Sequence, residues 1–128
     1  MTEEGRREER GLQYKSTRMA LNKQNRLKKK KDFEEVFKRG KAVKSSFLFA
    51  KYIRNDLGLP RVAFVVSAKV SKKAVDRNRI RRSLSEAFRL KLNEVSSIDL
   101  ILICDRKILN ALRDDIVEDV ENVIKKIK

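Results

Sequence analysis

The apolar run over residues 99–104 is the feature that most constrains the fold of this chain. It reads Asp-Leu-Ile-Leu-Ile-Cys, so five consecutive apolar side chains follow one acid. An apolar run this short and this continuous is typical of a strand buried within a sheet. The single cysteine, Cys104, ends the run, and we interpret it as a buried strand residue and not as a nucleophile.

Helical patterns lie on both sides of this strand. Phe33, Val36 and Phe37 predict a helix over about residues 33–39, with Asp32 and Glu35 in capping-box form. A second stripe predicts a helix over about residues 74–92, capped by Asp76 or Ser71. A third predicts an amphipathic helix from roughly residue 110 onward. The second stripe consists of Ile80, Leu84, Ala87 and Phe88, and the third of Leu109, Leu112, Ile116, Val120, Val123 and Ile127.

Two further strands are predicted between the first and second helices. Residues 47–53 are rich in aromatic side chains, and residues 61–66 consist of Arg61 followed by five apolar residues, three of them valine. Residues 55–60, Asn-Asp-Leu-Gly-Leu-Pro, have turn chemistry, so the two strands are expected to form a hairpin. A short extra strand is possible over residues 42–44. The predicted order is helix, strand, strand, helix, strand, helix, which is an α+β pattern.

The composition excludes several kinds of catalytic site. With no histidine, the chain cannot hold a histidine general base or a histidine-containing metal site. A two-metal nuclease would need clustered carboxylates, and we interpret the acids of the C-terminal third as solubilising charges. Those acids are Asp99, Asp105, Asp114, Asp115, Glu118, Asp119 and Glu121. No apolar stretch approaches the length of a membrane span, and no signal peptide is evident, so we expect a cytoplasmic protein without a membrane partner.

Charge is the unusual property of the chain. Its 128 residues, enough for one domain, contain 33 Lys and Arg against 18 Asp and Glu, a net charge of +15. Such an excess is normally offset by a polyanion. Residues 1–21 mix five basic and four acidic residues without apolar periodicity, so we expect a mobile, dispensable extension before a single domain over residues 22–128. Residues 22–31 form a basic arm, for which a merely solubilising role stays open.

The positive charge is concentrated in residues 69–91, where nine cations face two acids. On a helix, the apolar stripe shares one face, Arg77 and Arg81 lie at its edge, and Arg79, Arg82 and Arg89 lie on the exposed side. Arginine is informative because its planar fork bridges phosphate oxygens and stacks on bases. This pattern predicts nucleic-acid binding and leaves the choice between DNA and RNA open.

The segment Ala-Val-Asp-Arg-Asn-Arg-Ile-Arg-Arg over residues 74–82, with Glu-Ala-Phe-Arg-Leu over 86–90, resembles the signature of the protein subunit of bacterial ribonuclease P. The resemblance extends to residues 25–28, 32–40 and 61–67, and it covers about residues 22–128. It implies a two-layer α/β sandwich with a mixed sheet of about four strands, three helices and a left-handed βαβ crossover. It also implies that the partners are the catalytic RNA and precursor tRNA, with no obligate protein partner. By the same resemblance, the RNA is expected to use Mg²⁺ and perform the cleavage, and the protein side chains alone are expected to bind no cofactor. The isolated protein is expected to have no nuclease activity, because it lacks histidine, clustered carboxylates and any metal-ligand spacing.

Two groups of site residues follow from this resemblance. The catalytic RNA is expected to contact Lys69, Lys72, Lys73, Arg77, Asn78, Arg79, Arg81, Arg82 and Arg89. A cleft between the first helix and the sheet is expected to hold the 5′ leader of precursor tRNA, through Arg26, Lys30, Phe33, Phe37, Phe47, Phe49 and Lys51. Aromatic rings beside lysines suit a single strand, although Phe33 and Phe37 at i and i+4 also suit a packed core.

The chain departs from the family pattern in the loop before the second helix. Ala68 and Lys69 stand where the family commonly has paired lysines, so one phosphate contact fewer is expected. Residues 70–73 contain no glycine, where many members have one. The alternative hypothesis is a ribosomal or other structural RNA-binding protein, and an autonomous nuclease is a distant third.

Overall fold

The computed structural model describes residues 23–127, and residues 1–22 and 128 are outside the described part. A four-stranded mixed sheet with strand order β1-β2-β4-β3 forms its centre. The strands are β1 (Lys41–Lys44), β2 (Leu48–Arg54), β3 (Arg61–Val65) and β4 (Ile98–Cys104). The helices are α1 (Lys30–Arg39), α2 (Ala74–Lys91) and α3 (Arg113–Ile127), with short 3-10 turns η2 (Lys23–Asn25), η3 (Leu92–Glu94) and η4 (Arg106–Asn110).

Strand β4 lies inside the sheet, and this position makes the hairpin prediction wrong. β4 pairs antiparallel with β2 on one side and parallel with β3 on the other, so β2 and β3 are not neighbours. Six of the seven β4 residues are buried, which is the property that its apolar run predicted. A strand with no polar face is best accommodated between two others, and β4 therefore separates the two strands that the turn residues seemed to join.

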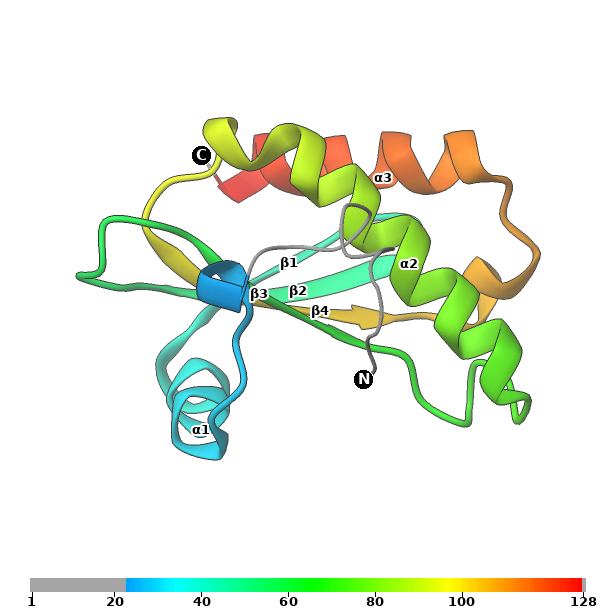
Figure 1. Cartoon of the computed structure of the whole chain (residues 1–128), viewed down its shortest axis with the longest axis horizontal. Helices are drawn as coiled ribbons and strands as arrows, with labels where there is room; N and C mark the ends of the chain where they lie inside the picture. Colours follow the sequence, from blue (N-terminus) through cyan, green and yellow to red (C-terminus); the bar gives the residue numbers. More distant parts are fainter. Residues whose placement is uncertain (1–22, 128) are drawn as a thin grey trace.

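Two helices cover one face of the sheet and one helix covers part of the other, as Figure 1 shows. Side chains from α2, α3 and the near face of the sheet form the main core, in which Phe88, Leu84 and Leu102 are fully buried. On the opposite face, α1 contributes Val36 to a smaller cluster with Leu27 and Ile101. The α+β class, with four strands and three helices, is confirmed.

The first helix begins earlier than predicted, and its predicted cap is wrong. α1 starts at Lys30, and its N-cap, Lys29, makes no side-chain capping bond. Asp32 lies inside the first turn, where its side chain forms an ion pair with Arg61 of β3 at 3.3 Å. The helix ends at Arg39 and Gly40 is its C-cap. A Cβ at Gly40 would lie 2.3 Å from the Val36 carbonyl oxygen and 2.9 Å from that of Tyr52, so no larger residue fits this close approach. Glycine therefore allows α1 to run directly into β1.

The starts of the other two helices also differ in detail. Lys73 is the N-cap of α2 and has no side-chain capping bond. Ser71 and Asp76, the two predicted caps, bond each other at 2.9 Å instead. α3 begins at Arg113, three residues after the predicted start, because residues 106–110 form the 3-10 turn η4. Asp105 caps η4 by accepting a hydrogen bond from the backbone N–H of Lys107.

The basic arm is docked on the sheet over residues 23–27. The backbone N–H of Leu27 donates to the Val62 carbonyl at 3.0 Å, and the Asn25 amide donates to the Pro60 carbonyl at 2.9 Å. This segment lies along the outer edge of β3 and pairs with backbone groups that an uncovered edge strand would leave exposed. The predicted extension over residues 1–21 falls outside the described residues. Among residues 23–127, no helix is both long and apolar enough to cross a membrane.

β3, α2 and β4 form a βαβ unit between adjacent parallel strands. This is the unit that the family resemblance implies, and its left-handed path stays a prediction. The unit places the arginine-rich helix on the outside of the main core, with its carboxyl end leading through η3 to β4.

Candidate nucleic-acid interface

α2 is fixed to the core by its apolar stripe. Ile80, Leu84 and Phe88 are fully buried, and Ala87 is nearly so. A helix held in this way has its opposite side turned to solvent. The polar residues of α2 are therefore displayed by a rigid element, and their side chains can meet a partner without reorganising the fold.

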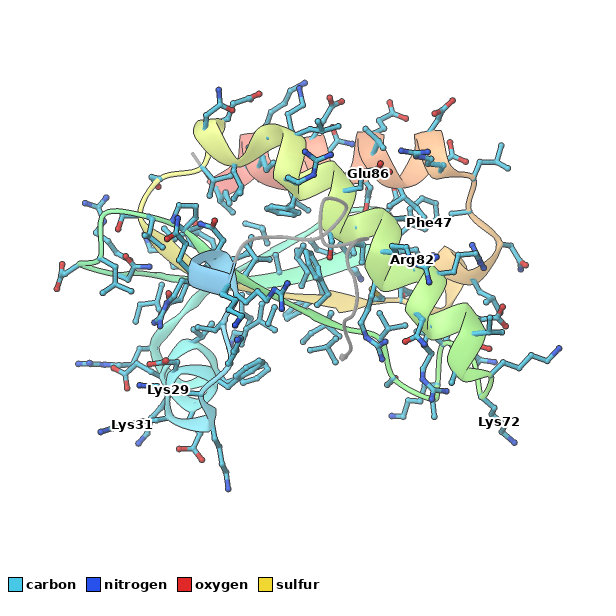
Figure 2. The ribbon with its side chains drawn as sticks, viewed as in Figure 1. Lys29, Lys31, Phe47, Lys72, Arg82 and Glu86 are labelled. Carbon is cyan, nitrogen blue, oxygen red and sulfur yellow. The ribbon has the colours of Figure 1, made fainter. Side chains whose placement is uncertain are left out.

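Most of the predicted cations on and before α2 are exposed. Arg82 and Arg89 are exposed, and within residues 23–127 their side chains make no hydrogen bond or ion pair. The same holds for the lysines of the preceding loop, Lys69, Lys72 and Lys73. Figure 2 shows Arg82 on the outer side of α2 and Lys72 in the loop that leads to it. These charges lack internal partners, as expected of groups that bind phosphate.

The remaining polar residues of this surface have contacts within the protein. Arg77 donates to the Ser71 carbonyl at 2.8 Å and so holds the loop against α2. Arg79 donates to the Leu109 carbonyl at 3.3 Å. Arg81 donates to the side-chain oxygen of Asn78, and Asn78 is itself exposed. The sequence predicted one uniform set of RNA contacts, whereas the structure divides it into free and internally bonded cations.

On the other face of the sheet, Phe37 and Lys51 form a pair that joins α1 to β2. The Phe37 ring is 44% exposed. The Lys51 ammonium donates to the Phe37 carbonyl at 2.9 Å and lies 6.0 Å from the centre of its ring. That distance is within the range of a cation–π contact. An exposed ring is thus held next to a positive charge, which is the combination that binds single-stranded nucleic acid.

The strand register extends this site across the sheet. Phe49, 39% exposed, lies two residues before Lys51 and therefore on the same face of β2. It pairs with Lys44 of β1 on one side and with Ile103 of β4 on the other. Directly opposed residues point to the same face, so Lys44 joins the surface. Sequence reasoning missed Lys44, because its place depends on a register that only the β1–β2 pairing defines.

Two of the predicted leader-binding aromatics are placed differently. Phe47 precedes β2 and packs against the main core beneath α2 and α3, which makes its assignment to the face of Phe49 and Lys51 wrong. Alternation could not apply to Phe47, because the residue lies outside the regular strand. Phe33 is half-buried against Leu27, Val36 and Ile101. Of the two alternatives for these rings, packing in the core describes Phe33, and exposure beside a lysine describes Phe37.

The two predicted cations near the start of this site lie on different elements. Arg26 forms an isolated parallel bridge with Val62 at the edge of β3, and burial lowers its pKa. Lys30 is exposed at the first position of α1. Its neighbours Lys29 and Lys31 project from the same end of α1, as Figure 2 shows. The amino end of α1 is therefore strongly positive.

A partly buried ion-pair network joins α1 to the sheet. The Arg61 guanidinium donates to both oxygens of Asp99 at 2.8 and 2.7 Å, and it also pairs with Asp32 of α1. The hydrogen bond to Asp99 is the main cause that raises the pKa of Arg61. Asn55 donates to the same carboxylate at 2.8 Å. Through Arg61, the position of α1 over β2 is tied to the interior of β3 and β4.

Two of the acids interpreted as solubilising are structural instead. Asp99 is 6% exposed and Asp119 is 3% exposed. Asp119 accepts hydrogen bonds from the backbone N–H groups of Ser46 and Phe47 and from the Ser45 hydroxyl. The helical and strand periodicities did not reveal these partners, because they come from distant segments. Among residues 23–127, no group of three or more metal-ligating side chains could hold an ion.

Comparisons with known proteins agree with this geometry. A family model described as Ribonuclease P matches residues 21–128. The ribonuclease P protein component of Clostridioides difficile (strain 630) is 34% identical over 110 residues, covering 84% of this chain and 96% of that protein. The solved structure of the Staphylococcus aureus RNase P protein has a TM-score of 0.76 at 28% identity, covering 81% of this chain and 95% of that one. A Staphylococcus aureus RNase P protein mutant with defective mRNA degradation activity has a TM-score of 0.76 at 27% identity, covering 82% and 89%.

The match spans the segments that carry both candidate surfaces, and it decides between the two main hypotheses. A structural RNA-binding protein of another kind would share the charge of α2 but not the whole-length likeness in sequence and fold. The chain belongs to the ribonuclease P protein family, and it is the tRNA-processing protein subunit of that ribonucleoprotein endoribonuclease, whose partner is the ribonuclease P RNA.

Proposed function

We propose that the two surfaces bind two different RNAs. The exposed cations of α2 and its preceding loop contact the catalytic RNA, and the site of Phe37, Phe49, Lys51 and Lys44 binds the single-stranded 5′ leader of precursor tRNA. The observation that carries the second assignment is the exposed Phe37 ring with the Lys51 ammonium fixed beside it. A stacking platform with an adjacent cation favours unpaired nucleotides, whereas a duplex offers no free base face.

In this arrangement the protein positions the substrate, and the RNA performs the chemistry with its own Mg²⁺. Lys51 supports the site in two ways, since it supplies positive charge and also holds the last turn of α1. Arg61 links α1 to β4 through its ion pairs with Asp32 and Asp99. A cytoplasmic location goes with this proposal.

Replacing Phe37 by alanine tests the leader site. Base stacking on an aromatic ring contributes about 1–3 kcal/mol per base. Phe37→Ala should therefore weaken holoenzyme binding of leader-bearing precursor tRNA by roughly 5- to 150-fold, with binding of mature tRNA unchanged. Phe37 is only partly buried, so the free energy of unfolding should fall by no more than about 1 kcal/mol.

Two controls accompany this measurement. Leu112→Ala removes an apolar side chain that is more exposed than Phe37, 71% against 44%, and that lies outside the site, so leader binding should stay unchanged. Phe33→Ala should instead lower the free energy of unfolding, by about 2 kcal/mol for a half-buried ring. An unaltered ratio of precursor to mature tRNA affinity in Phe37→Ala would overturn the leader assignment.

We also infer that the isolated protein does not cleave RNA. The chain has no histidine, and residues 23–127 hold no group of metal-ligating side chains suited to an ion. The mRNA degradation activity named for the Staphylococcus aureus protein gives this inference its sharpest test. RNA-free protein should leave both mRNA and precursor tRNA intact, with and without Mg²⁺. Cleavage that co-purifies with the protein through several columns would contradict it.

A further inference from the structure

A basic pocket lies outside both surfaces, between the β1–β2 turn and the last turns of α3. It has a volume of about 650 Å³ and is lined by polar and charged residues alone. These are Lys44, Ser45, Ser46, Asn122, Lys125 and Lys126. Among residues 23–127 no acidic residue lines it, whereas three lysines, two serines and one asparagine do. Such a set of donors suits an anion with several oxygen atoms, such as a phosphodiester.

The pocket is held in shape by bonds that leave most of its donors available. The Asp119 carboxylate fixes the turn by accepting three hydrogen bonds, at 2.7, 3.0 and 2.9 Å, from residues 45–47. Its negative charge is therefore engaged by the turn. Lys126 donates to the Lys44 carbonyl and ties α3 to β1. Among residues 23–127, the ammonium groups of Lys44 and Lys125 and the Ser46 hydroxyl make no hydrogen bond or ion pair.

The pocket is continuous with the leader site. An adjoining slot of about 180 Å³ shares Lys44, Ser45 and Ser46 with the pocket and is also lined by residues 47–49 and 103–105. These include Phe49, Ile103 and one acid, Asp105, which accepts a hydrogen bond from the backbone N–H of Lys107. Phe49 and Ile103 are paired on the sheet face that holds Lys51. Six residues of β2 and its turn, from Lys51 back to Ser46, thus link the Phe37–Lys51 pair to the basic pocket. At about 3.3 Å per residue, the path measures about 16 Å.

We propose that a leader strand bound at Phe37 and Phe49 continues over the β1–β2 turn, and that Lys44, Lys125 and Lys126 bind its phosphodiester groups. This inference rests on the proposed leader site and extends it from a stacking platform to a longer track. Lysines and hydroxyls contact the backbone without reading bases, so this part of the track is independent of leader sequence.

A structural role is the alternative for two of these lysines. Lys125 and Lys126 lie in the last turn of α3, where cations interact favourably with the helix dipole. In that case their removal would lower the stability of the protein and would affect all leader lengths alike. The length of the leader therefore separates the two roles.

The test measures the affinity of the reconstituted holoenzyme for precursor tRNAs whose leaders increase in length one nucleotide at a time. In the Lys125→Gln, Lys126→Gln double variant, affinity for mature tRNA should equal that of wild type. Once the leader is long enough to reach the pocket, the affinities of the wild-type and variant holoenzymes for precursor tRNA should differ by roughly tenfold at 0.15 M salt. Two lost phosphate contacts should reduce the log–log salt slope by about 1.4. The Lys125→Arg, Lys126→Arg double variant keeps both charges and should show the wild-type dependence of affinity on leader length.

A matched control loses the same charge elsewhere. Arg106→Gln with Lys107→Gln removes two cations from η4 and should leave the dependence on leader length unchanged. Equal affinities of wild type and the double lysine variant at every leader length would overturn the inference while the effect of Phe37→Ala still supports the leader site. Weaker binding of the catalytic RNA alone by the double lysine variant would assign the pocket to that RNA and would overturn it as well. If neither Phe37 nor the lysines affect leader binding, both proposals fail together.

Discussion

Arg82 on α2 and Arg61 in β3 carry the same side chain, and the structure uses them in opposite ways. Arg61 has two carboxylate partners and is largely buried, with 20% of its side chain exposed. Arg82 is exposed and, among the described residues, has no partner. The charge of Arg61 is satisfied within the fold, whereas the charge of Arg82 is available to a polyanion. Composition alone counts the two as equal, although only the charge of Arg82 is free to contact a polyanion directly.

The same contrast holds for the two faces of the sheet. The face under α2 and α3 buries the main core and displays charge on the outside of its helices. The face under α1 has a small core and leaves Phe37 and Phe49 partly exposed. We expect binding at the first surface to depend strongly on salt and binding at the second to depend on stacking.

The largest expected effect is at the charged surface. Replacing Arg79 and Arg82 with alanine should weaken binding of the catalytic RNA by at least roughly a hundredfold, since two charge-assisted hydrogen bonds at about 1.5–3 kcal/mol each contribute about 3–6 kcal/mol. The log–log salt slope should become shallower by about 0.7–0.9 for each lost phosphate contact. Thermal unfolding should stay near wild type, because the apolar stripe of α2 is intact. A wild-type salt slope in this variant would show that α2 is not the RNA surface.

A smaller effect is expected where the arginine is internal. Arg61→Met should lower the free energy of unfolding by about 2–3 kcal/mol, less than for a fully buried pair, because Asp99 stays buried without its main partner. Leader affinity should fall as well, since α1 loses its tie to the sheet. Asp32→Asn removes only the more exposed contact and should cost less than about 1 kcal/mol. Urea unfolding of the two variants compares them directly, and equal losses would contradict the network described for Arg61.

The sequence predicted those parts of the fold that depend on local pattern. The apolar run of β4, the stripe of α2 and the periodicity of α3 each determine one element within a few residues. The strand order could not be predicted from local pattern. The turn residues between β2 and β3 favour a hairpin, whereas in the structure β4 lies between the two strands. Helix starts were misplaced where an acid bonds to a distant partner, as Asp32 does with Arg61.

The candidate sites follow the same division. The exposed cations of α2 were predictable because helical periodicity places them opposite a buried stripe. The proposed leader site was predictable only in part, since periodicity cannot tell Phe33 from Phe37 and gives no register for Lys44. Asp119 illustrates the limit, because a position on α3 that reads as solvated is buried by a turn some 70 residues earlier.

The smallest expected effect concerns Cys104, the last residue of β4. Burial raises the pKa of its thiol to about 12, although the positive charge of Arg81 opposes the change. In the unfolded chain the thiol ionises near its ordinary value of about 8.5–9. The folded state therefore keeps a proton that the unfolded state loses, so this contribution to stability is complete below about pH 8.5 and is lost as the pH rises toward 12. The difference in unfolding free energy between wild type and Cys104→Ala should shrink by about 1.4 kcal/mol between pH 8 and pH 10. A thiol reagent at pH 8 should label Cys104 only as fast as the protein opens, and rapid labelling of the native protein would show that the α2 face of the sheet is less tightly closed than its core indicates.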